Sequence, residues 1–144
     1  MELNEQINKY FSLMQEWNVS YAEYAKFLGL SYLNLEILRA IYEHENCTQK
    51  FLSEYCFLPK QTVNIVITQF LKNGIIELAE IQNDRRSKSI QFTAEGKSYA
   101  QKVCDAIKQR ETAAMLSLNT EERDLLLKIT EKYIKKCNEK SDKQ

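Results

Sequence analysis

The chain has 144 residues, of which 44% are hydrophobic, and contains only three glycines and one proline. This composition excludes an intrinsically disordered chain, and so few helix-breaking residues favour a mostly helical protein. Because 20 basic residues balance 20 acidic residues, the net charge argues against a uniformly basic nucleic-acid coat but leaves room for a local basic patch.

The N-terminal part predicts two helices. Residues 3–28 carry apolar side chains spaced mostly by three and four, the spacing of a long amphipathic helix. This helix could bend or break near residues 18–20, and Gly29 is expected to end it. Residues 33–44 form the second predicted helix.

Two shorter helices joined by a tight turn follow, over residues 49–55 and from Pro59 to residue 72. Thr48 is a plausible N-cap for the first, since its hydroxyl can accept a hydrogen bond from a free backbone N–H. Pro59 suits the first turn of the second, where a missing N–H costs nothing. The spacing is typical of a helix-turn-helix, although an ordinary helical hairpin would share it.

The second of these short helices has an unusual exposed side. Gln61, Asn64, Thr68 and Lys72 lie opposite its apolar stripe, with Ile65 among them, and no acidic residue occurs from Pro59 to Asn73. A solvated helix more commonly carries Glu–Lys pairs. Removing carboxylates from a face is what proximity to phosphate requires.

Residues 75–82 and 88–92 predict two strands, with a charged turn over residues 83–88 that contains Asp84, Arg85 and Arg86. Helix, strand, charged turn, strand, helix is the order of a winged helix. In that fold a helix can enter the major groove of DNA while the turn reaches the backbone or the minor groove. A solvated hairpin tip is the alternative for the turn.

Two more helices complete the chain. Thr93 is expected to cap a helix that runs to about residue 115, and Asn119 to cap a last helix, with Glu122 as its capping-box partner. The fold class predicted is therefore mainly α with a small β-hairpin wing, and residues 140–144 are expected to be a frayed tail.

Several of these segments resemble the MarR family of bacterial transcriptional regulators, over nearly the whole chain. Asp84-Arg85-Arg86 resembles the Asp-Arg-Arg motif in the wing of the family. Phe92-Thr93-Ala94-Glu95-Gly96 resembles the family's Leu-Thr-x-x-Gly motif. Residues 70–76 look like the exit of its fourth helix and residues 48–53 like the start of its third. Ile65 departs from the family, which often has Arg there.

The resemblance implies one MarR-type domain over residues 1–144. Residues 31–96 would form a winged-helix DNA-binding core, and residues 1–30 and 97–140 the helices of a homodimer. It also implies a palindromic double-stranded DNA target and often a small effector. The apolar content of the terminal helices independently predicts the dimer, because a small winged core cannot cover them.

We therefore expect a DNA-binding transcriptional regulator. We expect it to act as a repressor that a small aromatic effector releases from DNA. The residues assigned to DNA contact are Thr48, Gln49, Lys60, Gln61, Thr62, Asn64, Thr68, Arg85, Arg86 and Lys88. Asp84 would orient one wing arginine. The residues assigned to an effector cleft, which would serve equally well in the core, are Tyr10, Phe11, Met14, Tyr21 and Tyr42.

Other chemistry finds little support. There is no phosphate-binding glycine loop, nucleophile elbow or second histidine, so we expect no enzyme, cofactor or metal. The four cysteines form no CxxC pair and are best explained as packing residues. Without a signal peptide or membrane span, we expect a cytoplasmic protein. Two alternative functions of the same fold remain. One is a winged-helix module that binds another protein, and the other is a sensor that responds to thiol oxidation or to a metal.

Overall fold

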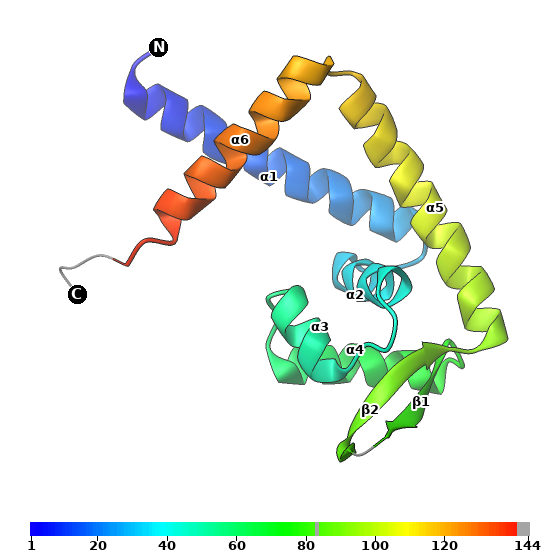
Figure 1. Ribbon diagram of the computed structural model, residues 1–144. Helices are drawn as coiled ribbons and strands as arrows, with labels where there is room; N and C mark the ends of the chain where they lie inside the picture. Colours follow the sequence, from blue (N-terminus) through cyan, green and yellow to red (C-terminus); the bar gives the residue numbers. More distant parts are fainter. Residues whose placement is uncertain (83, 141–144) are drawn as a thin grey trace. The chain divides into compact units, whose positions relative to one another are not determined.

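A computed structural model describes residues 1–82 and 84–140, except for the side chain of Arg85 (Figure 1). The chain divides into two compact units, Met1–Cys104 and Asp105–Gln144. The sequence instead predicted a division near residue 97 within one domain, and that functional division stays a prediction. The described residues form six helices and one two-stranded sheet, which confirms the predicted fold class.

The first unit begins with helices α1 (Leu3–Phe27) and α2 (Tyr32–Glu43). Helix α1 is continuous, so the chain is not broken at residues 18–20. Gly29 ends it as predicted: its φ is 82°, and the N–H of Leu30 donates to the carbonyl oxygen of Ala25 at 2.9 Å. The hydroxyl oxygen of Ser31 then accepts a hydrogen bond from the N–H of Asn34 and starts α2.

The helix-turn-helix consists of α3 (Gln49–Tyr55) and α4 (Lys60–Lys72). The N-cap prediction for Thr48 is confirmed, because its hydroxyl oxygen accepts from the N–H of Phe51 at 3.1 Å. Pro59 lies one residue earlier than predicted. It is the N-cap of α4, and its carbonyl oxygen accepts from the N–H of Val63 at 3.2 Å.

The core of the first unit lies among α2, α3 and α4. The side chains of Leu38, Leu52, Val63, Ile67 and Phe70 are at most 2% exposed. Burial of such aliphatic and aromatic side chains is the main force that holds the helices together. It fixes which side of α4 faces outward.

The hairpin that follows is formed by β1 (Ile76–Ile81) and β2 (Asp84–Phe92). Glu80 pairs with Lys88 and Ile81 with Asp84, so residues 85–87 have no partner in the register and form a bulge. The prediction that Asp84 to Arg86 lie in a turn outside the strands was wrong, because β2 already begins at Asp84.

The hairpin is attached to the connector between α2 and α3. The N–H of Ile90 donates to the carbonyl oxygen of Cys47 at 2.7 Å, which gives an isolated antiparallel bridge. Ser89, the neighbour of Ile90 in β2, is also buried, at 5% exposure, and its hydroxyl donates to Asn46 Oδ1 at 3.5 Å. The connector therefore covers both residues.

Helix α5 (Ala94–Leu116) runs through the division between the units, and α6 (Thr120–Cys137) lies in the second unit. Both predicted caps are confirmed. The hydroxyl oxygen of Thr93 accepts from the N–H of Gly96 at 3.0 Å, and the side chain of Asn119 forms a capping box with Glu122. Among the described residues, no helix is long and apolar enough to cross a membrane.

Candidate nucleic-acid interface

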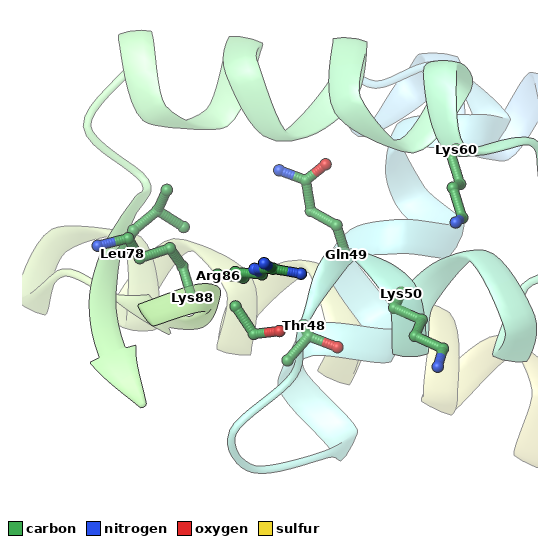
Figure 2. A pocket seen from close by; sticks show the side chains of 8 residues that line it. Thr48, Gln49, Lys50, Lys60, Leu78, Arg86 and Lys88 are labelled. Atoms are coloured by element: carbon green, nitrogen blue, oxygen red, sulfur yellow. The ribbon is translucent and has the colours of Figure 1, made fainter. Parts of the chain in front are cut away.

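A hollow of about 350 Å³ opens between the helix-turn-helix and the hairpin (Figure 2). Helix α3 and its cap supply three lining residues, α4 supplies one, β1 supplies one and β2 supplies three. The lining residues are Thr48, Gln49, Lys50, Lys60, Leu78, Arg86, Ser87 and Lys88. We call this place the basic hollow.

The charge of the basic hollow differs from that of the whole chain. Its described lining includes the cations Lys50, Lys60, Arg86 and Lys88 and no carboxylate, although acidic and basic residues are equal in number over the chain. One of these cations is in an ion pair: Lys88 Nζ lies 3.2 Å from the carboxylate of Glu80, which is largely exposed to solvent. Such a concentration of positive charge attracts a polyanion.

Polar side chains on the exposed surface connect α4 to α3 and to α2. The amide of Asn64 on α4 donates to Gln49 Oε1 on α3 at 3.2 Å. The amide of Asn34 on α2 donates to Gln69 Oε1 on α4 at 3.3 Å. These two bonds lie on the exposed side, outside the apolar core, and they hold polar groups of α3 and α4 in a defined arrangement.

The structure brings together half of the residues assigned to DNA contact. Thr48, Gln49, Lys60, Arg86 and Lys88 line the basic hollow, and Asn64 joins it through Gln49. Gln61, Thr62 and Thr68 lie on α4 outside this lining. The side chain of Arg85 lies outside the described residues.

Thr68 is partly engaged within its own helix. Its hydroxyl donates to the carbonyl oxygen of Asn64 at 2.7 Å, a bond that serine and threonine commonly form inside helices. Its hydroxyl oxygen keeps lone pairs that can accept, and its methyl group can make apolar contacts. Contact of Thr68 with DNA stays a prediction.

Sequence reasoning missed three lining residues, Lys50, Leu78 and Ser87. Lys50 had a usable signal, because it is the second residue of a helix whose first turn was already assigned to DNA contact. The sequence contains no signal that would have identified Leu78 and Ser87, since only the fold of the hairpin places them beside α3.

Asp84 acts on the wing through the backbone. Its Oδ1 accepts from the N–H of Arg86 at 3.0 Å. This bond, followed by one from the Ser87 hydroxyl, lowers the pKa of the Asp84 carboxyl below its ordinary value. The carboxylate thus fixes the backbone of the bulge from which the Arg86 side chain extends.

The cysteines are mostly packing residues, as predicted. Cys47, Cys56 and Cys104 are buried and only Cys137 is exposed. Burial, with smaller effects from Glu36 and Cys47, raises the pKa of the Cys56 thiol to about 11. A thiol that stays protonated is a poor nucleophile, so Cys56 is unsuited to fast oxidation.

His44 is the C-cap of α2. Its Nδ1–H donates to the carbonyl oxygen of Ala40 at 2.8 Å, and its ring packs against Phe51 and Tyr55. Within residues 1–82 and 84–140, no group of three or more His, Cys, Asp or Glu side chains could hold a metal ion.

The residues assigned to an effector cleft lie in different surroundings. Tyr21 packs between Trp17 and Tyr32, with ring centroids 6.0 and 5.9 Å apart. Tyr42 packs against Phe92, at 6.4 Å, and lines a second hollow of about 370 Å³. Tyr10, Phe11 and Met14 are exposed along α1. A cleft shared by all five residues stays a prediction.

Comparison with known proteins identifies the winged-helix segment, since residues 28–87 match the model of the MarR family. This segment belongs to the MarR family. It contains α2, α3, α4, β1 and the first residues of β2, and therefore all the residues that line the basic hollow except Lys88. No curated protein matches the chain.

Solved structures of MarR proteins are similar over nearly the whole chain. A MarR/EmrR family transcriptional regulator from Acinetobacter sp. ADP1 is 16% identical, with a TM-score of 0.75 over 96% of this chain and 99% of that one. MepR of Staphylococcus aureus in complex with DNA is 15% identical, with a TM-score of 0.74 over 91% and 96%.

A third structure, of MarR from Staphylococcus aureus in complex with salicylate and kanamycin, is 16% identical, with a TM-score of 0.74 over 96% of this chain and 93% of that one. At such identities the likeness shows the fold. The chain therefore has the MarR winged-helix fold, with helices before and after the winged segment.

Proposed function

We propose that this protein is a sequence-specific, double-stranded DNA-binding transcriptional regulator. The observation that carries the proposal is the basic hollow, where four cations and no carboxylate gather beside the acid-free face of α4. The MarR fold supports it, and a protein of that fold, MepR, has been solved in complex with DNA.

In the proposed complex, α4 enters the major groove. Gln61, Thr62 and Asn64 then approach base edges, to which amide and hydroxyl side chains can hydrogen bond. Lys60 and the cap region of α3, with Thr48 and Gln49, contact phosphates and set the position of α4. Arg86 reaches the backbone or a narrow minor groove from the hairpin.

A homodimer is part of the proposal. No residue of α6 is buried within the described chain, although α6 carries the large apolar side chains Leu125, Leu126, Leu127, Ile129, Tyr133 and Ile134. Helix α1 also exposes Leu3, Ile7, Phe11 and Trp17. A second copy of the chain would cover such faces, and its symmetry would make the DNA target a palindrome.

We further propose that the protein is a repressor released by a small aromatic effector. The fold is shared with a MarR protein solved in complex with salicylate. Release requires that the effector bind more tightly to a conformation that does not fit the operator than to the one that does.

The test is selection of bound sequences from a random duplex pool, followed by a salt titration on the selected site. A phosphate-contacting dimer should lose affinity steeply as salt rises, whereas a winged helix used only for protein contact should select no sequence and show no such slope. A selected palindrome would support the dimeric mode. Release of the selected duplex by salicylate would support the effector proposal.

A further inference from the structure

One residue on the acid-free face of α4 differs in kind from its neighbours. Ile65 is 60% exposed, whereas the other β-branched aliphatic residues of the same helix, Val63, Val66 and Ile67, are at most 1% exposed. Ile65 is therefore not part of the core. It also lies outside the exposed apolar faces of α1 and α6.

The surroundings of Ile65 are polar and are held in place. Gln61 lies one helical turn before it and Thr68 three residues after it, so the three side chains project from one face. Asn64, immediately before it, is bonded to Gln49 on α3. Ile65 thus lies next to Gln61 and Asn64, which the proposed function places against base edges.

Helix formation gives no reason for isoleucine at this position. At an exposed helix site, Lys, Glu or Gln has a better propensity, because a β-branched side chain loses rotamer freedom. A contact with DNA in the bound state would explain why isoleucine occupies this position. The C5-methyl group of thymine is the only apolar group that the bases present in the major groove.

We propose that Ile65 is a specificity-determining residue that contacts the C5-methyl group of a thymine in each half-site of the operator. This inference rests on the proposed function, since it requires α4 to lie in the major groove. The contact adds no hydrogen bond. It excludes water from one methyl group and from the exposed part of the isoleucine side chain, which favours T·A over pairs that present an amino group or a bare ring edge there.

The experiment removes that one methyl group. Each thymine of the selected duplex is replaced in turn, in both half-sites, by deoxyuridine, which pairs with adenine in the same way. At one position per half-site we expect affinity to fall by about fourfold for each methyl group lost, the effect of one buried methyl group.

Variants of the full chain assign the effect to Ile65. Ile65→Ala should bind the thymine duplex more weakly and should no longer respond to deoxyuridine at that position, while its response at other thymines is unchanged. Ile65→Val, which keeps a branched apolar side chain, should keep most of the response. Because Ile65 is exposed, thermal melting of both variants should match that of the natural chain.

The outcomes separate this inference from the function on which it rests. If a selected duplex binds with a steep salt slope but no thymine position changes its response in Ile65→Ala, Ile65 does not read a methyl group and only this inference is wrong. If no duplex is selected and no salt-dependent binding is found, the proposed DNA-binding function itself is contradicted.

Discussion

A Cβ atom on Gly96 would lie 1.8 Å from the carbonyl oxygen of Ile75. The same oxygen accepts a hydrogen bond from the N–H of Thr93 at 3.1 Å, so the first turn of α5 is pressed against the residue that precedes β1. The obstacle is backbone and cannot rotate away. Close packing therefore requires the glycine at the end of Thr93-Ala94-Glu95-Gly96. Backbone conformation does not require it, because the φ of Gly96 is not in the left-handed region.

Gly96→Ala should destabilise the protein by about 3 kcal/mol or more, because the start of α5 must move away from the hairpin. Gly74→Ala is a matched control. Gly74 has a φ of 71° and open space around its Cβ position, so alanine there should cost only about 1–2 kcal/mol of backbone strain. Urea unfolding of both variants measures the difference. Equal losses would show that the contact with Ile75 relaxes easily.

Phe57→Gly should stabilise the protein by about 1 kcal/mol, because Phe57 has a left-handed φ of 55° that glycine adopts without strain. Little packing is lost, since Phe57 is 92% exposed. Phe57→Ala is the control, as it removes the ring but keeps the strain, and should not stabilise. The measurement is the urea midpoint of each variant. A loss of stability in Phe57→Gly would mean that the ring makes a contact in solution.

The stability of the protein should fall as pH rises from about 9 to about 11. The pKa of Cys56 is raised to about 11 in the folded chain, so the folded state holds the thiol proton at pH values where the unfolded chain has released it. Stability from this group is complete below the unfolded pKa and is lost toward the folded pKa. Burial also raises the pKa values of Cys47 and Tyr99, which act in the same direction.

Cys56→Ala isolates the contribution of Cys56, because alanine does not titrate. Its free energy of unfolding, measured at several pH values, should fall less steeply than that of the natural chain over this window. Parallel curves would contradict the raised pKa of Cys56.

Local chemistry explains why the helix ends were predictable. The caps at Thr48, Thr93 and Asn119 depend on a side-chain oxygen and an N–H three residues away, which the sequence contains in full. Gly29 likewise ends α1 through a conformation that other residues avoid. Periodicity then gave the helices between these points.

The arrangement of the wing depended on contacts that the sequence does not contain. The bulge at residues 85–87 follows from the register that Ile76 and Phe92 impose at the other end of the hairpin. Lys50 joins Arg86 in one hollow only because Ile90 is bonded to Cys47, which brings the hairpin against the start of α3. Turn composition alone favoured a longer loop and could not reveal this attachment.

The protein should sediment with twice the mass of the 17.0 kDa chain at micromolar concentration. The reason is the exposed apolar surface of α6, which in a lone chain would remain in contact with water. Leu126→Glu combined with Ile129→Glu should shift the mass toward 17.0 kDa. Lys128→Glu, which adds acid to the same helix without removing apolar surface, is the control. A natural chain that sediments at 17.0 kDa would contradict the dimer.

Arg86→Ala should weaken DNA binding without unfolding the protein. The exposed side chain of Arg86 lines the basic hollow. Arg86 contributes to the fold through its backbone N–H, which still donates to Asp84 in the variant. The change in thermal stability should therefore stay within about 0.5 kcal/mol. Loss of a groove or phosphate contact should cost about 1–3 kcal/mol per wing, and a symmetric dimer loses two.

The salt dependence distinguishes the two kinds of contact that Arg86 can make. If the guanidinium neutralises a phosphate, affinity should fall on every sequence and the salt slope should flatten by about 1 for each wing. If it enters a narrow minor groove, A·T-rich flanks should lose most. Lys97→Ala, which removes one exposed cation outside the basic hollow, is the control and should keep the natural affinity and slope. Affinity of Arg86→Ala equal to that of the natural chain at every salt concentration would remove the wing from the mechanism and leave binding to α3 and α4.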